Sequence, residues 1–390
     1  MPTTTAAPAQ DTVQAALATV QDPEIKRPVT ELGMVDDVRI DPDGSVRVRI
    51  LLTVSGCPLK ETLTRDTQQA VGAVPGVTRV EVELGVMTDE QRHGLREQLK
   101  GGASTRDIPF ARPGSLTRVL AIASGKGGVG KSSVTVNLAA EMARSGLAVG
   151  VVDADVYGHS VPDMLGVGDR RPTQVDDMIM PVEAHGVRAI SIGMLKPRKD
   201  QVVAWRGPML DRALVQMLSD VFWGDLDVLL LDLPPGTGDV AISLGQHLAN
   251  AEVLVVTTPQ QAAADVAERA GTMASMLRQR VAGVVENMSY LPCPHCGPEH
   301  RLEVFGSGGG DRVAATLAQR FGYDVPVLAR IPLDERLRAG GDDGVPLVLS
   351  DPDAAAAVEL TGVARELTSR TRGLAGMQLG LTPAGRPAGG

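Results

Sequence analysis

The chain contains few cysteines and few aromatic residues. Its 390 residues include three cysteines, and aromatic residues make up 2%. So few thiols exclude a disulfide framework in a chain of this length. The scarcity of aromatic rings leaves the core to Val, Leu, Ile and Ala. The length allows two domains and a substantial core.

The first ten residues have neither the basic stretch nor the apolar core expected of a targeting leader, and the chain lacks a long apolar run and an excess of positive charge. The formal net charge is -9, with 22% charged residues, and the start reads MPTTTAAPAQ. This acidic balance excludes nonspecific DNA binding and docking on anionic lipid as bulk properties. No run approaches the length needed to span a bilayer. We therefore expect a cytoplasmic protein with neither nucleic acid nor membrane as a partner.

A glycine-rich segment, GKGGVGKSS at 125–133, follows an apolar run and precedes a helix-like stretch. In this context it predicts a phosphate-binding loop, in which glycines turn backbone N–H groups toward a phosphate. Lys131 is expected to reach the terminal phosphates, and the Ser132 hydroxyl to bind Mg²⁺. The residues expected to hold the nucleotide in this loop are Gly125, Lys126, Gly127, Gly128, Val129, Gly130, Lys131, Ser132 and Ser133.

The same letters also match Gly-x-Gly-x-x-Gly, with Asp153 where a dinucleotide fold places its ribose-binding acid. Two observations favour a triphosphate instead. The Lys131-Ser132 pair has no role in gripping a pyrophosphate, and a second motif, DVLLLDLPPGTGD, follows at 227–239. Its apolar run ends in Asp232, which is expected to hold Mg²⁺ through water. Lys126 is not needed to build the loop, so its charge is free to reach another phosphate from outside.

Several polar residues follow apolar runs, where ligands bind in parallel sheets. Asp155 is expected to orient the water that attacks the γ-phosphate, and Asp153 to support Mg²⁺. A solvated turn aspartate is the alternative for Asp155. For Asn287 two interpretations stay open, contact with the adenine edge or a bond to its own backbone. Asp239 is expected to cap the following helix.

The pattern from Arg118 onward predicts the fold class, an α/β P-loop NTPase with a mostly parallel sheet flanked by helices. Its apolar runs are continuous rather than alternating, which is typical of strands covered on both faces. The runs expected as strands are 119–124, 147–153, 228–232, 253–258 and 281–288.

A small α/β domain is expected before this ATPase domain. It comprises a helix at 12–20, an alternating strand at 46–54, a helix from about Lys60 and a strand at 78–86. The expected organisation is a disordered leader at 1–10, the small domain at 11–99, a linker at 100–117, the ATPase domain at 118–370 and a disordered tail at 371–390.

Cys293 and Cys296 form a Cys-x-x-Cys pair that predicts a metal site. Tetrahedral zinc needs four ligands and a cubane cluster usually takes four cysteines. Two copies of the chain supply four thiolates, so the stoichiometry favours a homodimer with the metal between the subunits. Structural zinc stays open as the alternative, because cysteine spacing does not identify the metal. His295 is either a zinc ligand or a spacer facing solvent.

Cys57 stands between an expected strand and an expected helix, and is either a reactive thiol or transient ligand, or a buried cysteine. The motifs WRG at 205–207 and FGSGGG at 305–310 stand out, but the residues alone assign them no role.

The motifs GKGGVGKSS, DADVYGHS, WRGPM, DLPPGTGD, TTPQ, VENMS, CPHCG and FGSGGG occur in this order between about Arg118 and about Pro352. Together they resemble the Mrp/ApbC family of iron-sulfur cluster carrier ATPases. Residues 11–98, with DPE, ELGMV and LTVSGCP, are similar to the small iron-sulfur assembly domain fused to bacterial members of that family.

The resemblance implies an ATP-binding homodimer of the deviant Walker A class, which includes MinD, ParA and the nitrogenase iron protein. In that class the residue matching Lys126 crosses to the partner's phosphates. In the family the residues matching Cys293 and Cys296 bind a bridging 4Fe-4S cluster, which is handed to apoproteins. The resemblance thus selects iron-sulfur over zinc, and implies apo client proteins and cluster scaffold proteins as partners.

The sequence therefore predicts a slow, switch-like ATPase that carries iron-sulfur clusters. Lys131, Ser132 and Asp232 are expected to hold MgATP, while Lys126 and Asp155 support hydrolysis. Two rival functions make different demands. A positioning ATPase of the MinD or ParA kind needs a membrane-binding tail or a basic DNA-binding face, and a zinc-stapled regulatory ATPase would hold zinc in place of iron and sulfide.

Overall fold

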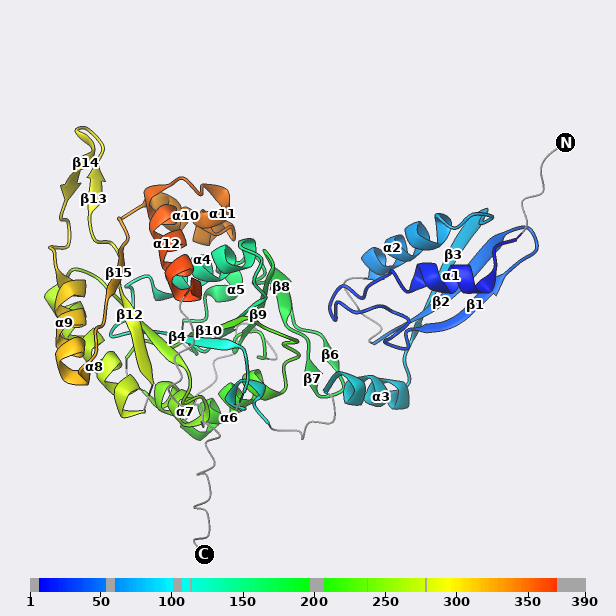
Figure 1. Cartoon of the computed structure of the whole chain (residues 1–390), viewed down its shortest axis with the longest axis horizontal. Helices are drawn as coiled ribbons and strands as arrows, with labels where there is room; N and C mark the ends of the chain where they lie inside the picture. Colours follow the sequence, from blue (N-terminus) through cyan, green and yellow to red (C-terminus); the bar gives the residue numbers. More distant parts are fainter. Residues whose placement is uncertain are drawn as a thin grey trace, which may run out of the picture.

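The structure is a computed structural model that describes residues 7–53, 60–100, 107–112, 114–156, 158–196, 207–236, 238–277 and 279–369. Cys57, Trp205, most of the expected leader, part of the expected linker and the expected tail lie outside the described residues. The described part forms a small N-terminal unit and a larger unit (Figure 1).

The N-terminal unit is a three-stranded mixed sheet with helices. The sheet has the order β1-β2-β3, in which β1 and β2 are antiparallel and β2 and β3 are parallel. The elements are α1 (Gln10–Leu17), β1 (Val35–Ile40), β2 (Ser45–Leu52), α2 (Lys60–Gly72), β3 (Arg79–Val86) and α3 (Asp89–Lys100). The expected helices and strands are confirmed, and β1 and α3 are additions. The alternation along β2 is confirmed as well, because Val46, Val48, Ile50 and Leu52 are all buried.

The larger unit is built on an eight-stranded sheet of order β15-β12-β11-β4-β10-β5-β9-β8. All neighbours are parallel except β8, which runs antiparallel to β9. The strands are β4 (Arg118–Ser124), β5 (Val149–Asp153), β8 (Val182–Ala184), β9 (Val187–Ser191), β10 (Val228–Asp232), β11 (Glu252–Thr257), β12 (Arg280–Glu286) and β15 (Val327–Arg330). The predicted fold class and the five predicted strands are confirmed.

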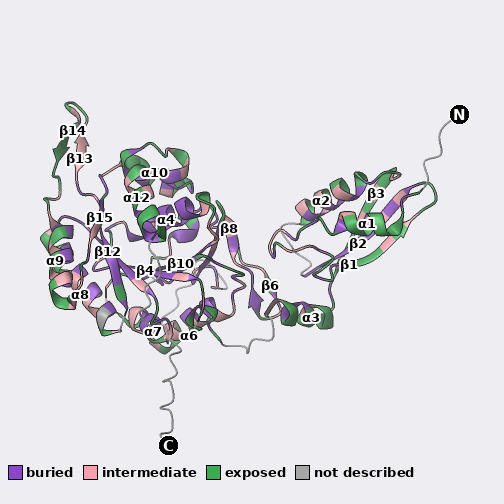
Figure 2. Cartoon of the chain, viewed as in Figure 1, coloured by how far each residue is buried: buried purple, intermediate pink, exposed green. Residues whose placement is uncertain are grey.

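Helices cover both faces of this sheet, and two apolar cores result. One core lies under α4 and α12, and the other under α6, α7, α8 and α9. The helices are η1 (Pro109–Ala111), α4 (Lys131–Arg144), α5 (Val161–Met164), α6 (Gly207–Ser219), α7 (Asp239–His247), α8 (Gln261–Met276), α9 (Gly309–Phe321), α10 (Glu335–Asp343), α11 (Leu347–Ser350) and α12 (Ala355–Ser369). Figure 2 shows the central strands as buried and the outer faces of the helices as exposed. None of the described helices is both long and apolar enough to cross a membrane.

Two hairpins extend from the larger unit. The first pairs β6 (Gln174–Val175) with β7 (Met178–Ile179), and the second pairs β13 (Leu291–Cys293) with β14 (Gly297–Leu302). Figure 1 shows the β13–β14 hairpin projecting away from the sheet, at the upper left.

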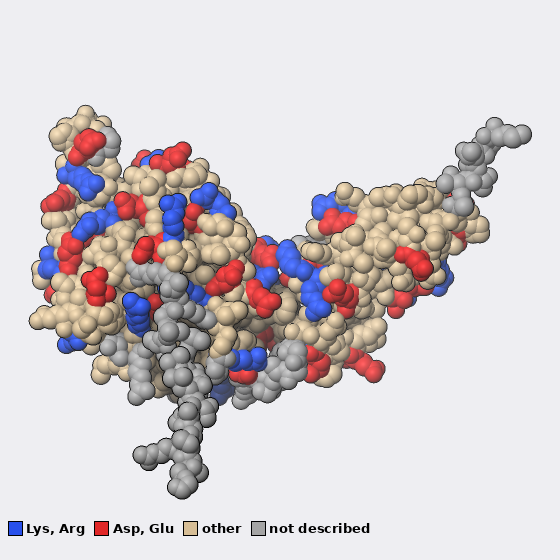
Figure 3. Space-filling model, viewed as in Figure 1, with Lys and Arg blue, Asp and Glu red and all other residues tan. Residues whose placement is uncertain are grey.

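The N-terminal unit packs on the β6–β7 hairpin. Val175, Met178 and Met180 are buried in the same apolar cluster as the core of the N-terminal unit. Polar contacts surround this cluster: the Thr173 hydroxyl donates to the Glu24 carboxylate at 2.9 Å, and Arg96 pairs with Asp177 at 3.3 Å. Lysines and arginines are interspersed with acidic residues on the face shown in Figure 3.

Candidate nucleotide site and cysteine hairpin

The phosphate loop connects the buried strand β4 to the N-terminus of α4. Gly128 and Gly130 have φ values of 79° and 81°, in the left-handed region that favours glycine. A Cβ on Gly125 would collide with the backbone of Val266 and Ala267 in α8. The glycines therefore allow a tight turn and close packing, and α4 begins at Lys131 directly after the loop. The backbone N–H groups at this helix start lack partners within the helix and favour an anion.

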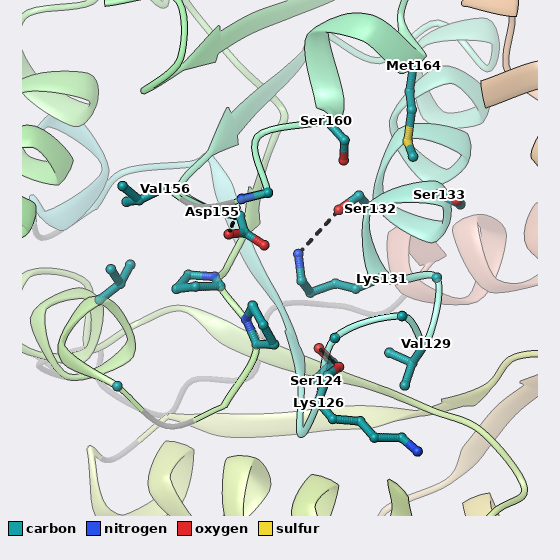
Figure 4. A pocket seen from close by; sticks show the side chains of 18 of the residues that line it. Ser124, Lys126, Val129, Lys131, Ser132, Ser133, Asp155, Val156, Ser160 and Met164 are labelled. Atoms are coloured by element: carbon teal, nitrogen blue, oxygen red, sulfur yellow. Dashed lines mark hydrogen bonds between the residues drawn. The ribbon is translucent and has the colours of Figure 1, made fainter. Parts of the chain in front are cut away.

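A cavity of about 650 Å³ lies over the loop (Figure 4). Its lining includes loop residues from Lys126 to Ser133, together with Asp155, Leu210 and Asp239. Gly125, Asp153, Asp232 and Asn287 do not line the cavity. The structure thus brings most of the predicted nucleotide residues to one cavity, whereas these four are not part of its lining.

Asp232 is the centre of a buried polar network beneath the loop. It is 0% exposed and its carboxylate pairs with the Lys131 ammonium at 2.8 Å. The Ser132 hydroxyl donates to the same carboxylate at 2.6 Å, and the Thr135 hydroxyl donates to its other oxygen at 2.7 Å. A hydroxyl and a carboxylate are hard oxygen ligands of the kind that Mg²⁺ prefers. The residues predicted to bind Mg²⁺ therefore lie together and have suitable chemistry.

Asp153 lies beside Asp232 on the neighbouring strand, and the two residues are register partners. Burial raises the pKa of Asp153 well above its usual value, and the Asp232 carboxylate raises that pKa further. The Ser191 hydroxyl donates to the Asp153 carboxylate at 3.1 Å, and the backbone N–H of Asp155 donates to it at 3.2 Å. Its oxygens thus face protein donors and not the cavity, and its supporting role toward Mg²⁺ stays a prediction.

Asp155 differs from Asp153 because it does line the cavity. One of its carboxylate oxygens accepts a hydrogen bond from the Gly158 N–H at 2.9 Å, which fixes the turn after β5. Figure 4 shows this carboxylate facing the Lys131 side chain across the cavity. The position suits the predicted contact with an attacking water. Since Asp155 is buried, the alternative of a solvated turn aspartate does not describe it.

Lys126 points away from Lys131 (Figure 4). Its ammonium donates to the Gln260 side-chain oxygen at 3.0 Å, within its own chain. Gln260 belongs to the TTPQ motif that follows β11, so this motif holds the Lys126 side chain at the edge of the cavity. Lys126 can reach the phosphates of a partner subunit, as predicted, only if this hydrogen bond breaks.

Asn287 contacts the phosphate loop from behind. It is 2% exposed, and its side-chain amide donates to the Val129 carbonyl at 2.9 Å. Neither a bond to its own backbone nor a position in the described cavity wall is seen, so contact with adenine stays a prediction. A Cβ on Gly130 would collide with this amide, which is a second reason for glycine at that position.

The expected capping role of Asp239 is wrong. The N-cap of α7 is Gly238, and no side-chain hydrogen bond caps the helix. Asp239 is the first residue of the helix and lines the cavity next to Pro234 and Pro235. Its carboxylate lies so close to Gly207 that a Cβ there would approach it to 2.7 Å. The WRG motif thus ends at the cavity wall.

Cys293 and Cys296 lie together at the tip of the β13–β14 hairpin. The Cys296 N–H donates to the Cys293 sulfur at 3.3 Å, and Cys296 is exposed. The backbone N–H groups of Cys296 and His295 lower the pKa of Cys293, since both stabilise the thiolate. Within the described residues, no set of three or more His, Cys, Asp or Glu side chains forms a metal-binding group.

Sequence reasoning missed three polar residues that organise these sites: Thr135, Glu286 and Ser289. Thr135 lies one helical turn after Lys131, a spacing that places both residues on one face of α4. Glu286 accepts a hydrogen bond from the Gly310 N–H at 2.6 Å, which gives the FGSGGG motif a role in anchoring α9. Only the Thr135 spacing was a signal in the sequence.

A parallel sheet with a glycine-rich phosphate loop after β4 and a buried aspartate at the end of β10 defines a P-loop nucleoside triphosphatase. Residues 115–368 match the family described as "NUBPL iron-transfer P-loop NTPase", and residues 10–84 match the family described as "Iron-sulfur cluster assembly protein". The chain belongs to the NUBPL iron-transfer P-loop NTPase family, and the predicted resemblance to Mrp/ApbC proteins is confirmed.

Relatives that carry the name "Iron-sulfur cluster carrier protein" align over most of the chain. The protein from Mycobacterium tuberculosis is 59% identical over 96% of this chain and 97% of its own length. The protein from Synechocystis is 40% identical over 92% and 97%, respectively. A solved nucleotide-binding protein from Archaeoglobus fulgidus, in complex with ADP, is 36% identical over 58% of this chain and 86% of its own, with a TM-score of 0.49.

Proposed function

We propose that this chain is an ATP-hydrolysing carrier that binds a 4Fe-4S cluster between two subunits and transfers the cluster to apoproteins. The cysteine pair at the tip of an exposed hairpin, in a chain that also has a complete phosphate loop, is the observation that carries the proposal. The name and the high identity of the relatives support the same cargo.

The donor set supports a site shared by two copies. A cubane cluster usually takes four cysteine ligands, whereas the hairpin offers Cys293 and Cys296, and the described residues add no third ligand beside them. Two hairpins related by a two-fold axis would supply four thiolates. The lowered pKa of Cys293 favours the thiolate form, which is the form that binds metal. The exposed position leaves the cargo accessible to apo client proteins and to scaffold proteins.

The phosphate loop supports ATP binding in the cavity. Its N–H groups and the Lys131 ammonium would hold the terminal phosphates, and Asp232 positions both Lys131 and Ser132. Mg²⁺, held by Ser132 and by Asp232 through water, would neutralise phosphate charge. Asp155 would orient the attacking water, because phosphoryl transfer depends on positioning and charge stabilisation more than on a strong base.

Lys126 supports a switch that depends on the dimer. Its ammonium donates a hydrogen bond to Gln260 at the edge of the cavity. To contact the phosphates bound by the second subunit, Lys126 would have to break this hydrogen bond. Hydrolysis would then require a particular subunit arrangement, and turnover would be slow because a switch needs long-lived states.

The test is anaerobic reconstitution of the full chain with iron and sulfide, followed by quantification of both per dimer. The wild type should bind four irons and four sulfides per dimer, as a cubane requires. Cys293→Ala should lose the cluster yet bind ATP, because the hairpin tip lies outside the nucleotide cavity. Lys131→Ala should keep the cluster yet lose hydrolysis by about 100-fold or more, as when a transition-state donor is removed.

His295→Ala is the matched control, since it changes the same turn without removing a thiol. A full cluster in Cys293→Ala would refute the carrier assignment. Zinc without iron in anaerobically purified protein, lost together with His295, would support the zinc-stapled ATPase instead.

A further inference from the structure

The cysteine hairpin is fixed to the sheet at one buried carboxylate. Glu286, the last residue of β12, is 2% exposed. It accepts a hydrogen bond from the hydroxyl of Ser289, on the segment that enters the hairpin. Its other oxygen accepts the Gly310 N–H at 2.6 Å, on the segment that leaves the hairpin. The segment that enters the hairpin and the start of α9, which follows the hairpin, are therefore both hydrogen-bonded to the same strand end.

The next residue along the chain contacts the phosphate loop. The Asn287 amide donates to the Val129 carbonyl at 2.9 Å. The Val129 carbonyl and the Gly130 N–H belong to one planar peptide group, so the orientation of one fixes the orientation of the other. If the Gly130 N–H turns toward a phosphate, the Val129 carbonyl must turn with it, and this carbonyl accepts the hydrogen bond from Asn287.

The backbone between the two contacts has little freedom. Met288 has a φ of 54°, a left-handed value that is uncommon for a residue with a side chain and that persists only where neighbours impose it. The backbone N–H groups on either side are also held, Asn287 by the Thr257 carbonyl at 2.8 Å and Ser289 by the Ile331 carbonyl at 2.9 Å. These constraints leave the segment few alternative conformations, so we expect a displacement at Val129 to reach Ser289.

We propose that Asn287 is a positioning residue. It couples nucleotide binding at the phosphate loop to the stability of the cluster bound at the cysteine hairpin. This inference rests on the proposed function, because it requires both ligands. Coupling between two binding sites is reciprocal. ATP should therefore change the stability of the bound cluster by the same factor by which the cluster changes the affinity for ATP.

The experiment uses the full chain reconstituted with its cluster. The fraction of iron taken by a ferrous chelator at equilibrium is measured over a range of chelator concentrations, with and without a non-hydrolysable ATP analogue. The affinity for the analogue is measured with and without cluster. In the wild type each ratio should be at least about fivefold, the lower end of typical coupling between sites. In Asn287→Ala both ratios should fall to near one, while the cluster content stays at the wild-type value.

Asn250→Ala is the matched control. The Asn250 amide also donates to a backbone carbonyl, that of Phe110, at 3.0 Å, but lies apart from the nucleotide cavity and the hairpin. This variant should keep the wild-type ratios. If Asn287→Ala does not fold, Ser289→Ala replaces it, since it removes the hydroxyl that holds the hairpin to Glu286, and it should lower both ratios.

Three results would overturn the inference while the proposed function stands. They are a wild-type ratio near one, wild-type ratios together with wild-type ATP affinity in the folded Asn287→Ala or Ser289→Ala variant, and wild-type ratios together with weaker ATP binding in Asn287→Ala. The last result would favour a contact between Asn287 and adenine. A wild type that binds no cluster or no ATP would overturn the proposed function as well.

Discussion

Lys131 compensates the negative charge of the carboxylates that are buried beneath the nucleotide site. Asp153 and Asp232 are both fully buried and adjacent on neighbouring strands, and their mutual repulsion contributes to the raised pKa of Asp153. The Lys131 ammonium, 2.8 Å from Asp232, supplies the compensating charge. Removal of one partner from a buried ion pair typically destabilises a protein by about 3–5 kcal/mol. Loss of ATP hydrolysis in Lys131→Ala must therefore be measured together with thermal stability.

At the same scale, the Cys293 thiol should ionise at a lower pH than an ordinary cysteine. Its pKa is lowered first by the Cys296 N–H and then by the His295 N–H, both of which stabilise the thiolate and not the thiol. In metal-free, reduced protein, alkylation of Cys293 by iodoacetamide should begin to rise at a lower pH than alkylation of the same site in the urea-unfolded chain. Peptide mass spectrometry measures the extent at each pH.

The control is Cys296→Ala, which keeps the backbone N–H of residue 296 and removes the second thiol. Cys293 in this variant should still alkylate at a lower pH than in the unfolded chain. Coincident pH profiles for folded and unfolded Cys296→Ala would show that the backbone donors do not stabilise the thiolate.

Among the elements, α4 has a glycine with positive φ at each end. Gly130 is the N-cap residue before α4, with a φ of 81°, and Gly146 lies two residues after Arg144, the last residue of the helix, with a φ of 91°. Gly146→Ala should cost about 1–2 kcal/mol of unfolding free energy, because an added Cβ is strained in the left-handed region but meets no other atom within 4 Å. Gly130→Ala should cost about 1–3 kcal/mol more, because its Cβ forces the Asn287 amide from the Val129 carbonyl.

Urea unfolding of both variants beside the wild type measures the difference. Equal losses would mean that the Asn287 amide moves aside at no cost, and that its contact with the loop does not stabilise the fold.

The central elements follow from local sequence, whereas the peripheral ones depend on tertiary packing. Strands such as β4 and β10 are continuous apolar runs, and the glycine spacing of the phosphate loop is local. β15 and β8 are short, with 4 and 3 residues, and carry no comparable run. The contacts of Asn287 and Glu286 join segments 158 and 24 residues apart. No spacing rule connects such segments, so sequence reasoning did not find these contacts.

At the scale of the whole molecule, the N-terminal unit and the larger unit share an apolar cluster. Met178 of the β6–β7 hairpin is 2% exposed in that cluster. Met178→Asp would place a charge there, at a cost far above that of a surface change. We expect the two units to separate, with a larger radius of gyration by small-angle X-ray scattering and with ATP hydrolysis retained, because Met178 lies outside the nucleotide cavity.

Val358→Asp, an exposed apolar residue of α12 changed in the same way, should scatter like the wild type. An unchanged radius of gyration for Met178→Asp would show that polar contacts such as Arg96 with Asp177 suffice to hold the units together.

The shared cluster also bears on how the dimer is studied. A chain shortened to begin at Arg118 would keep the phosphate loop and the cysteine hairpin, but would leave Val175, Met178 and Met180 uncovered. Bare apolar side chains of this kind promote self-association. Oligomers of such a fragment would then arise from the cut surface and imitate subunit pairing through the thiols, so stoichiometry has to be measured on the intact chain.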